Sequence, residues 1–359
     1  MTDLLAAAAE LVDIPSLSHH EGALADRLES DLGAAPWLAV ERVGDNVVAR
    51  TDLGRDNRLI LAGHTDTVPP NGNGRARLDG DVLWGLGSAD MKAGLAVFRE
   101  LALTVSEPEM DVTYVFYACE EVDQAHNGLV QLLRDRPDLL DGDAAVLGEP
   151  TGGRVEAGCQ GTMRAKLVIR GERAHTARPW VGANAIHRLG PFLHRLAGYE
   201  GRRPVLDGCE YREALQAVGV EGGVANNVVP DEVTLTLNHR YAPDRRTGEA
   251  FLHLVEIFEP LLDRGRGDGL ELVADSIPAP PGLTHPLLAR LVQLTGRPPA
   301  AKLGWTDVSF FASSGIPATN FGPGDPLLAH TAGERVERHD IEQAFTLLQG
   351  YLRDDPKRG

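Results

Sequence analysis

The chain has 359 residues, of which 43% are hydrophobic and 24% charged, a composition typical of a globular protein with about two domains. Its 35 Lys and Arg against 52 Asp and Glu give a formal net charge of −17, which argues against nucleic acid or an anionic membrane as the main partner. No stretch approaches the roughly 18 apolar residues that cross a bilayer. Acidic Asp3 and Glu10 stand where a signal peptide is positive, and three dispersed cysteines suit a reducing compartment, so we expect a cytoplasmic protein.

The first 150 residues alternate between helical patterns and short apolar runs. A helix is expected over Leu4–Val12, and a second helix should begin at a capping-box spacing, in which Ser18 precedes Glu21 by three residues, and end near Leu32. Strands that alternate with helices predict an α/β domain with a largely parallel mixed sheet and helices on both faces. The expected strands are Asn46–Ala49, Arg58–Ala62, Val112–Ala118 and Ala144–Leu147, and the helices among them are Lys92–Leu103 and Leu129–Arg134.

The pattern changes near residue 161 and resumes its first form after the proline-rich segment Pro278–Pro281. The elements in between follow the order β-α-β-β-α-β of a ferredoxin-like α+β domain. They are Met163–Arg170, Ala183–Ala197, Ala217–Val220, Glu232–Arg240, Gly248–Leu262 and Leu270–Ala274, followed by Pro286–Leu294, Asp307–Ser314 and Ile341–Leu352 after the return. We therefore expect a catalytic domain made of residues 1–160 and 277–359, with residues 161–276 inserted as a separate domain.

Acidic and histidine residues follow several of the predicted strands. The carboxyl ends of parallel strands meet at one edge of a sheet, so these side chains are expected to lie close together. Each residue taken singly is explained as a cap or a solvated side chain, but two histidines and three carboxylates together suit one or two zinc-like ions. The glycines of Gly85–Gly87 lack the third glycine of a nucleotide-binding loop. The histidines are His64 and His330, and the acidic residues from which three ligands would come are Asp66, Asp90, Glu120, Glu121 and Glu149.

Five segments resemble the M20 family of dinuclear zinc amidohydrolases and exopeptidases, and the resemblance extends over the whole chain. It implies a zinc exopeptidase-like catalytic domain, two Zn²⁺ ions per subunit for which Co²⁺ can substitute, and a homodimer formed through the inserted domain, which would also act as a lid. Within the family the motifs are most similar to those of actinobacterial enzymes that act on N-succinyl-LL-2,6-diaminopimelate. The segments are Gly63–Pro69, Gly87–Lys92, Cys119–Glu121, Gly148–Thr151 and Gly322–Thr331.

The resemblance assigns five metal ligands to two sites that share one residue. Asp90 would bridge the two ions. His64 and Glu149 would complete one site, and Glu121 and His330 the other. Three ligand carboxylates against two divalent cations leave a net charge of +1, so a bridging water would be acidified toward hydroxide.

Three further residues are given catalytic roles by the resemblance. Glu120 would take a proton from the attacking water and deliver it to the leaving amine. Asp66 would orient His64. His175, in Gly171–Pro179, would reach the active site of the partner subunit and stabilise the oxyanion, although the residues alone also allow an ordinary loop histidine.

Substrate binding is implied for Asn226 and Arg240, with Arg178 and Thr306 as further candidates. An arginine suits bidentate capture of a substrate carboxylate, although Arg240 at a strand end can also be a surface ion-pair residue. Two stretches depart from the better-studied enzymes of this activity. The chain has Cys159-Gln160-Gly161-Thr162 where they have Arg-Arg-Gly-Ser, and Gly304-Trp305-Thr306-Asp307 where they have Gly-Thr-Ser-Asp.

The interpretation that follows is hydrolysis of N-succinyl-LL-2,6-diaminopimelate to succinate and LL-2,6-diaminopimelate, a small-molecule reaction of lysine and cell-wall precursor synthesis. A related deacylase or exopeptidase, such as an acetylornithine deacetylase, a carboxypeptidase or an aminoacylase, would use the same metals. A non-catalytic binding protein of the same fold is the alternative from another class. Loss of Glu120 or of a ligand would favour that alternative, and none of these residues is missing.

Overall fold

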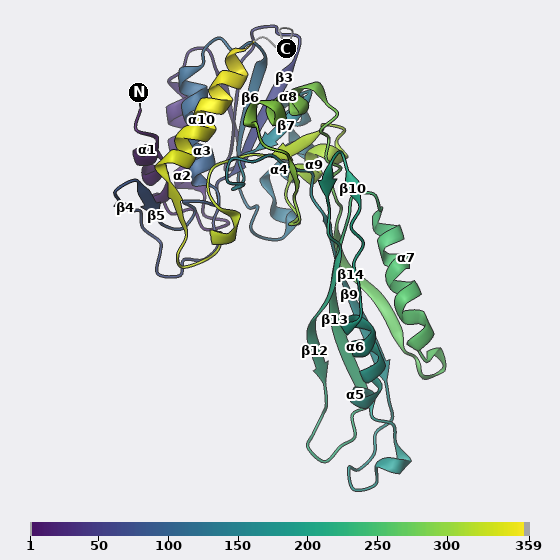
Figure 1. Ribbon diagram of the computed structural model, residues 1–359. Helices are drawn as coiled ribbons and strands as arrows, with labels where there is room; N and C mark the ends of the chain where they lie inside the picture. Colours follow the sequence, from purple (N-terminus) through teal and green to yellow (C-terminus); the bar gives the residue numbers. More distant parts are fainter. Residues whose placement is uncertain (1, 355–359) are drawn as a thin grey trace. The chain divides into compact units, whose positions relative to one another are not determined.

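The computed structural model describes residues 2–354 and divides the chain into two compact units (Figure 1). The larger unit comprises Met1–Gly158, Pro281–Ala300 and Thr306–Gly359, and the smaller unit Cys159–Pro280 and Ala301–Trp305. Residues 161–276, the expected insertion, all lie in the smaller unit, which also takes in 159–160, 277–280 and 301–305 of the expected catalytic domain. Residue 1 and residues 355–359 of that expected domain lie outside the described residues.

The larger unit is built on a mixed sheet of eight strands. Four neighbouring strands at its centre, β6, β3, β7 and β16, run parallel, whereas β1, β2 and β8 pair in antiparallel fashion. In spatial order the strands are β1 (Ala39–Val43), β2 (Asn46–Arg50), β6 (Asp111–Tyr117), β3 (Arg58–His64), β7 (Ala144–Leu147), β16 (Ala318–Asn320), β8 (Glu156–Ala157) and β15 (Ala300–Ala301). A separate small sheet joins β17 (Arg335–Glu337), β5 (Val82–Trp84) and β4 (Arg77–Asp79).

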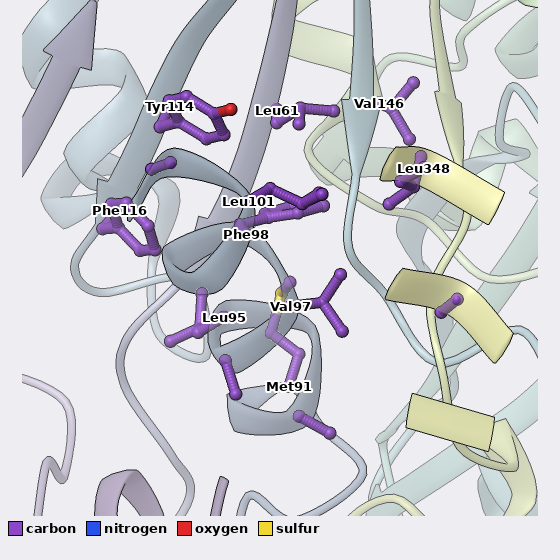
Figure 2. Close-up of a cluster of buried hydrophobic side chains, with 14 of the residues drawn as sticks. Leu61, Met91, Leu95, Val97, Phe98, Leu101, Tyr114, Phe116, Val146 and Leu348 are labelled. Atoms are coloured by element: carbon purple, nitrogen blue, oxygen red, sulfur yellow. The ribbon is translucent and has the colours of Figure 1, made fainter. Parts of the chain in front are cut away.

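Helices cover both faces of this sheet, which confirms the predicted fold class. Side chains alternate across a strand, so Leu59 and Leu61 of β3 enter the core that five helices complete, while the equally buried Ile60 points to the opposite face with α4 and α9. Figure 2 shows α3 at the centre of this core, with Phe98 and Leu101 beside the strands. The five helices are α1 (Leu4–Val12), α2 (Gly22–Gly33), α3 (Lys92–Thr104), α8 (Pro286–Thr295) and α10 (Arg338–Arg353), and the two opposite are α4 (Gly128–Asp135) and α9 (Val308–Ser313).

The smaller unit is a four-stranded antiparallel sheet with helices packed against it. The strand order β12-β13-β9-β14 and the chain order β-α-β-β-α-β are those of a ferredoxin-like fold. Its elements are β9 (Gly161–Arg170), α5 (Ala185–Arg188), α6 (Gly190–Ala197), β10 (Val205–Leu206), β11 (Cys209–Glu210), β12 (Ala214–Gly222), β13 (Glu232–Tyr241), α7 (Thr247–Phe258) and β14 (Gly269–Ser276). The single helix expected over Ala183–Ala197 is two helices, because Pro191 lacks the N–H that a continuous helix needs and instead starts α6.

Short elements complete the description of the two units. Six 3₁₀ turns occupy Gln124–His126, Pro137–Leu140, Pro179–Val181, Glu259–Leu261, Arg264–Arg266 and Pro326–Leu328. Strands of two or three residues were not predicted, because so short a segment carries no readable periodicity. None of the helices in residues 2–354 has the length and apolar character needed to pass through a bilayer.

The predicted capping box is wrong. Helix α2 begins at Gly22, and Glu21 precedes it without a side-chain cap. The Ser18 hydroxyl instead donates to Asp66 Oδ2 at 2.8 Å, and Glu21 Oε1 accepts from the backbone N–H of Cys119 at 3.0 Å. Both side chains are therefore turned away from the helix terminus, toward the loops at the end of the central strands.

Candidate metal centre

The carboxyl ends of three neighbouring parallel strands carry several of the residues predicted for the metal centre. His64 is the last residue of β3, Glu120 lies three residues beyond β6, and Glu149 lies two residues beyond β7. Because β6, β3 and β7 are adjacent and parallel, their ends meet at one edge of the sheet. Asp90 joins them from the loop that leads into α3, and His330 from the loop after the last 3₁₀ turn.

Asp90 lies between two histidines, with one oxygen directed at each. Its Oδ1 is 3.1 Å from His64 Nε2, and its Oδ2 is 3.5 Å from His330 Nε2. Glu121 Oε1 is 2.7 Å from the same His330 nitrogen. Two groups of donor atoms each fall within 4.8 Å of one another, namely His64 with Glu120 and Glu121, and Asp90 with Glu121 and His330. Four of the five predicted ligands therefore lie together, with Asp90 between the two histidines, whereas Glu149 belongs to neither group.

The cluster carries far more negative than positive charge. In the described part of the chain, none of its carboxylates Asp66, Asp90, Glu120, Glu121 and Asp307 forms an ion pair with lysine or arginine. Uncompensated buried charge costs several kcal/mol per ion, roughly, so a cationic partner is needed. Imidazole nitrogens and carboxylate oxygens are the donors of zinc-like divalent cations. The residues present thus fit a pair of metal ions.

The pKa values follow from this crowding. Burial alone would lower the pKa of His64, but hydrogen bonds to Asp66 and Asp90 outweigh it and raise that pKa. Hydrogen bonds with Asp90 and Glu121 raise the pKa of His330 to about 10. Burial, followed by repulsion from Asp307, raises the pKa of Glu120 well above its usual value. Glu149 contributes to the same repulsion, which places this buried carboxylate close to Glu120.

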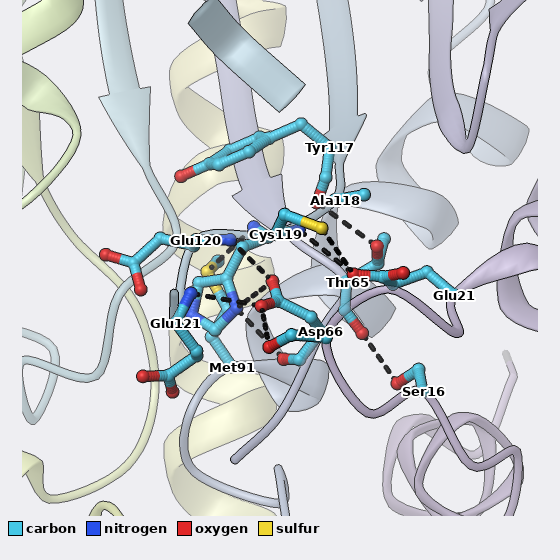
Figure 3. A network of polar contacts seen from close by, with 12 residues as sticks. Ser16, Glu21, Thr65, Asp66, Met91, Tyr117, Ala118, Cys119, Glu120 and Glu121 are labelled. Atoms are coloured by element: carbon cyan, nitrogen blue, oxygen red, sulfur yellow. Dashed lines mark hydrogen bonds and ion pairs between the residues drawn. The ribbon is translucent and has the colours of Figure 1, made fainter. Parts of the chain in front are cut away.

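Asp66 fixes the turn that carries the two glutamates (Figure 3). Its side chain is fully buried, and its Oδ1 and Oδ2 accept from the backbone N–H groups of Glu120 at 2.9 Å and Glu121 at 3.0 Å. Its Oδ1 is also 3.5 Å from His64 Nδ1, and its own backbone oxygen is 3.1 Å from that nitrogen. That Asp66 orients His64 stays a prediction. The structure adds the two hydrogen bonds by which Asp66 holds the backbone of Glu120 and Glu121.

The turn itself reverses at Cys119, a non-glycine residue with φ of 59°. Such left-handed backbone is costly for residues with a Cβ and persists where neighbours hold it. Here Glu21 accepts from the Cys119 N–H, and Gly128 N–H donates to the Ala118 carbonyl at 2.8 Å. Burial raises the pKa of the Cys119 thiol to about 12, so the thiol is not an activated nucleophile.

Close backbone contacts hold the position of Glu149. A Cβ on Gly94 of α3 would lie 2.3 Å from the carbonyl oxygen of Gly148, and a Cβ on Gly322 would lie 2.4 Å from the same atom. Only glycine allows α3 and the loop after β16 to approach the end of β7 this closely. Substitution of either glycine would displace the residue immediately before Glu149.

Thr306 and Asp307 are two neighbouring buried residues, and Asp307 contributes a further carboxylate to the site. Thr306 is buried and its hydroxyl donates to Asn320 Oδ1 at 3.0 Å. Asp307 is fully buried, accepts from Asn127 Nδ2 at 2.8 Å and is the strongest source of repulsion on Glu120. Sequence reasoning did not assign Asp307 a role, although it falls in a stretch already noted as a departure from related enzymes.

The remaining predicted residues lie in the smaller unit. His175 is exposed, its Nδ1 accepts from the Ala177 N–H at 3.0 Å, and its backbone pairs with Val228 next to the exposed Asn226. Arg178 is also exposed. Arg240 is half-buried and forms no ion pair with any residue in the range 2–354.

A partly buried set of histidines and carboxylates at the carboxyl ends of parallel strands, with an additional glutamate beside it, defines a metal-dependent hydrolase. The model of peptidase family M20/M25/M40 matches residues 60–354, and the chain belongs to this family. It is 50% identical to the "Putative succinyl-diaminopimelate desuccinylase DapE" of Mycobacterium tuberculosis over 349 residues, which cover 96% of each chain. It is 44% identical to the succinyl-diaminopimelate desuccinylase of Corynebacterium glutamicum, covering 95% of this chain and 94% of that one.

Solved structures share the fold over nearly the full length. A tripeptidase from Staphylococcus aureus superposes with a TM-score of 0.78 at 22% identity, covering 99% of this chain and 98% of that chain. A dinuclear metal-binding peptidase of the M20 family from Bacillus subtilis superposes with a TM-score of 0.71 at 15% identity, covering 97% and 96%. The family model and the two relatives confirm the predicted family, and the solved structures confirm the fold.

Proposed function

We propose that this protein hydrolyses the succinyl amide of N-succinyl-LL-2,6-diaminopimelate, releasing succinate and LL-2,6-diaminopimelate. The observation that carries the proposal is the convergence of Asp90, both histidines and the pair Glu120–Glu121 at one sheet edge. The near full-length relatives of 50% and 44% identity support the choice of substrate.

We propose two Zn²⁺ ions as the resident metals, with Co²⁺ able to replace them. Asp90 would be shared, His64 and Glu149 would hold one ion, and Glu121 and His330 the other. The opposite orientation of the two Asp90 oxygens supports this division. When bound, such ions polarise an amide carbonyl and lower the pKa of water.

Glu120 is the proton carrier in this proposal. It lies within 4.8 Å of the donor atoms of His64 and Glu121, and Asp66 holds its backbone. Burial and repulsion from Asp307 raise its pKa, so the carboxylate can take a proton from the attacking water and keep it until the amine leaves. The proton passes to the amine nitrogen as the C–N bond breaks, so that the amine leaves as a neutral group.

The smaller unit is proposed to complete the site in a homodimer. His175 Nδ1 accepts a hydrogen bond, so in the neutral ring Nε2 carries the proton and can donate to the oxyanion of a partner subunit's substrate. Strand β12 lies at a sheet edge, where Val218 and Val220 are 60% and 61% exposed, and an unpaired edge of this kind can join a second copy. The three buried cysteines are thiols rather than disulfides, which supports a cytoplasmic location.

Arg240 is proposed to bind a substrate carboxylate. Asn226 and Arg178 are further candidates, in the loops at the opposite end of β13. Burial lowers the pKa of Arg240, and an arginine that lacks an internal ion-pair partner suits a planar carboxylate. Thr306 would contribute by ordering the segment before Asp307, since its hydroxyl is directed at Asn320.

The test is a substrate panel with purified, metal-loaded protein. We expect release of LL-2,6-diaminopimelate from its N-succinyl form and little hydrolysis of N-acetylornithine or dipeptides. Preferential cleavage of N-acetylornithine or of dipeptides would support a related deacylase or exopeptidase instead. Binding of less than one metal ion per chain after addition of zinc would support a non-catalytic protein.

A further inference from the structure

Glu334 is a buried carboxylate that contacts the loop of Asp90 without being one of the predicted ligands. Its side chain is only 1% exposed, and its Oε1 accepts from the backbone N–H groups of Ala89 and Asp90, both at 3.0 Å. Its own carbonyl accepts from the N–H of Gly85 at 3.2 Å. Glu334 therefore holds the loop before α3 at two points, Gly85 and Ala89–Asp90. Asp90 is the residue that lies between the two histidines.

The same residue belongs to the loop of His330. Glu334 lies four positions after that histidine, and its N–H donates to the carbonyl of Thr331 at 3.2 Å. A turn thus separates His330 from Glu334, while the Glu334 side chain reaches across to Asp90. This side chain joins the loops of Asp90 and His330, two ligands that are 240 residues apart in the chain.

Asp66 provides a precedent within the molecule. It accepts from the N–H groups of Glu120 and Glu121, as Glu334 does from those of Ala89 and Asp90. In both places a buried carboxylate from a distant segment fixes the backbone of a turn that carries ligands. Glu334 is absent from both groups of candidate ligands found in residues 2–354.

We propose that Glu334 is a positioning residue of the metal centre, which sets the geometry of Asp90 relative to His330 through backbone hydrogen bonds. The inference rests on the proposed metal-dependent function. Partners that orient metal ligands typically change metal affinity or activity about 10–100-fold when they are lost. Glu334 therefore governs how tightly Asp90 and His330 hold metal.

The experiment compares Glu334→Ala, Glu334→Gln and Glu334→Asp with a matched control, Asp111→Ala. Asp111 is also buried and accepts from backbone N–H groups, those of Leu53 and Arg55, but it lies at the opposite end of β6. Zinc affinity is measured by competition with a chelating dye, the thermal midpoint of the metal-free protein by calorimetry, and kcat and KM with the succinylated substrate.

Glu334→Ala is expected to weaken zinc binding about 10–100-fold and to lower kcat more than it changes KM. Glu334→Gln should recover most of this affinity, because its amide oxygen can accept the same two N–H groups. Glu334→Asp, one methylene shorter, should fold yet remain weakened. Asp111→Ala should lower the thermal midpoint and leave zinc affinity unchanged.

Wild-type zinc affinity in Glu334→Ala, or an equal loss in Asp111→Ala, would overturn the inference and leave the proposed function intact. Failure of Glu334→Gln to recover affinity would also overturn it, because the role assigned is hydrogen-bond acceptance. Should Glu334→Ala not fold, Glu334→Asp decides, and undiminished affinity in that variant overturns the inference. A wild-type protein that binds no metal would instead overturn the proposed function.

Discussion

The buried carboxylates of the smaller unit and those of the candidate metal centre differ in their cationic partners. In the smaller unit Glu213 has no exposed side-chain surface and pairs with Arg202 at 2.7 Å and Arg245 at 3.2 Å. Asp268, equally buried, pairs with Arg188 at 2.7 Å. Among residues 2–354, Asp90 and Glu121 of the candidate metal centre in the larger unit form ion pairs with histidines and with no arginine or lysine.

This difference separates carboxylates that stabilise the fold from carboxylates that can bind a metal ion. A buried carboxylate with an arginine is neutralised permanently by the chain itself. One without an arginine stays available for a cation from solution, and its stability depends on that cation. The predictions below test the distinction, beginning with the largest expected effect.

Glu120→Gln should abolish most of the activity and leave metal binding intact, because Glu120 is proposed to transfer a proton and not to bind metal. We expect kcat to fall roughly 10²–10⁴-fold, the usual contribution of a general acid–base group. Metal content by atomic emission should stay at the wild-type value. Loss of metal from this variant would show that Glu120 is itself a ligand.

His175→Ala tests whether the smaller unit takes part in the reaction. We expect kcat to fall about 10²–10³-fold, as on removal of one oxyanion donor, with metal content unchanged. Mixing this variant with Glu120→Gln supplies the control, because a residue that acts on the partner subunit should restore activity in heterodimers. A near-normal rate in His175→Ala would contradict the role.

Metal removal should loosen the larger unit alone. A ligand at a hundred times its Kd stabilises the folded state by about 2.7 kcal/mol, and the smaller unit supplies its own cations. Hydrogen–deuterium exchange with and without a chelator should show faster exchange around β3 and β6 and no change in β13. Glu213→Gln provides the reverse control, with faster exchange in β13 and unchanged metal affinity. Equal effects of chelation on both units would refute the comparison.

His239 makes the smaller unit sensitive to acid. Burial is the main cause that lowers the pKa of His239 to about 4. Repulsion from His253, Arg245 and Arg202 lowers it further, whereas attraction to Glu213 opposes the shift. The neutral ring is therefore favoured in the folded state, so stability is unaffected above about pH 6.5 and is lost as the pH falls from there toward 4.

The expected loss at pH 5 is on the order of 1–2 kcal/mol. His239→Phe should remove this dependence while filling a similar volume. Exchange of β13 amides measured from pH 7 to pH 5, after correction for the intrinsic rate, provides the measurement. An unchanged acid sensitivity in the variant would assign it to other groups.

Some of the site could be read from the sequence because its signals are local. His64, Glu120 and Glu149 follow apolar strands directly, and the strand periodicity places their side chains at one sheet edge. Ser18 and Glu21 show the limit of such signals. Their spacing is the same as that of a capping box, and only the fold reveals that the competing partners are Asp66 and Cys119.

Glu334 and Asp307 carried no usable local signal. Each is a single acid in a loop, and its importance comes from partners 180 to 245 positions away, the Asn127 amide for one and the Ala89 and Asp90 N–H groups for the other. A pattern of neighbouring residues cannot encode such a contact.

The alternation of apolar runs and the donors placed after them determined the class of fold and the chemistry of the site, because side-chain periodicity and ligand type belong to the residues themselves. Tertiary structure alone decided which backbone groups the buried carboxylates hold, since hydrogen bonds depend on distances in space that chain folding creates. Tertiary structure therefore also decides which carboxylates are neutralised by arginine and which remain for a cation.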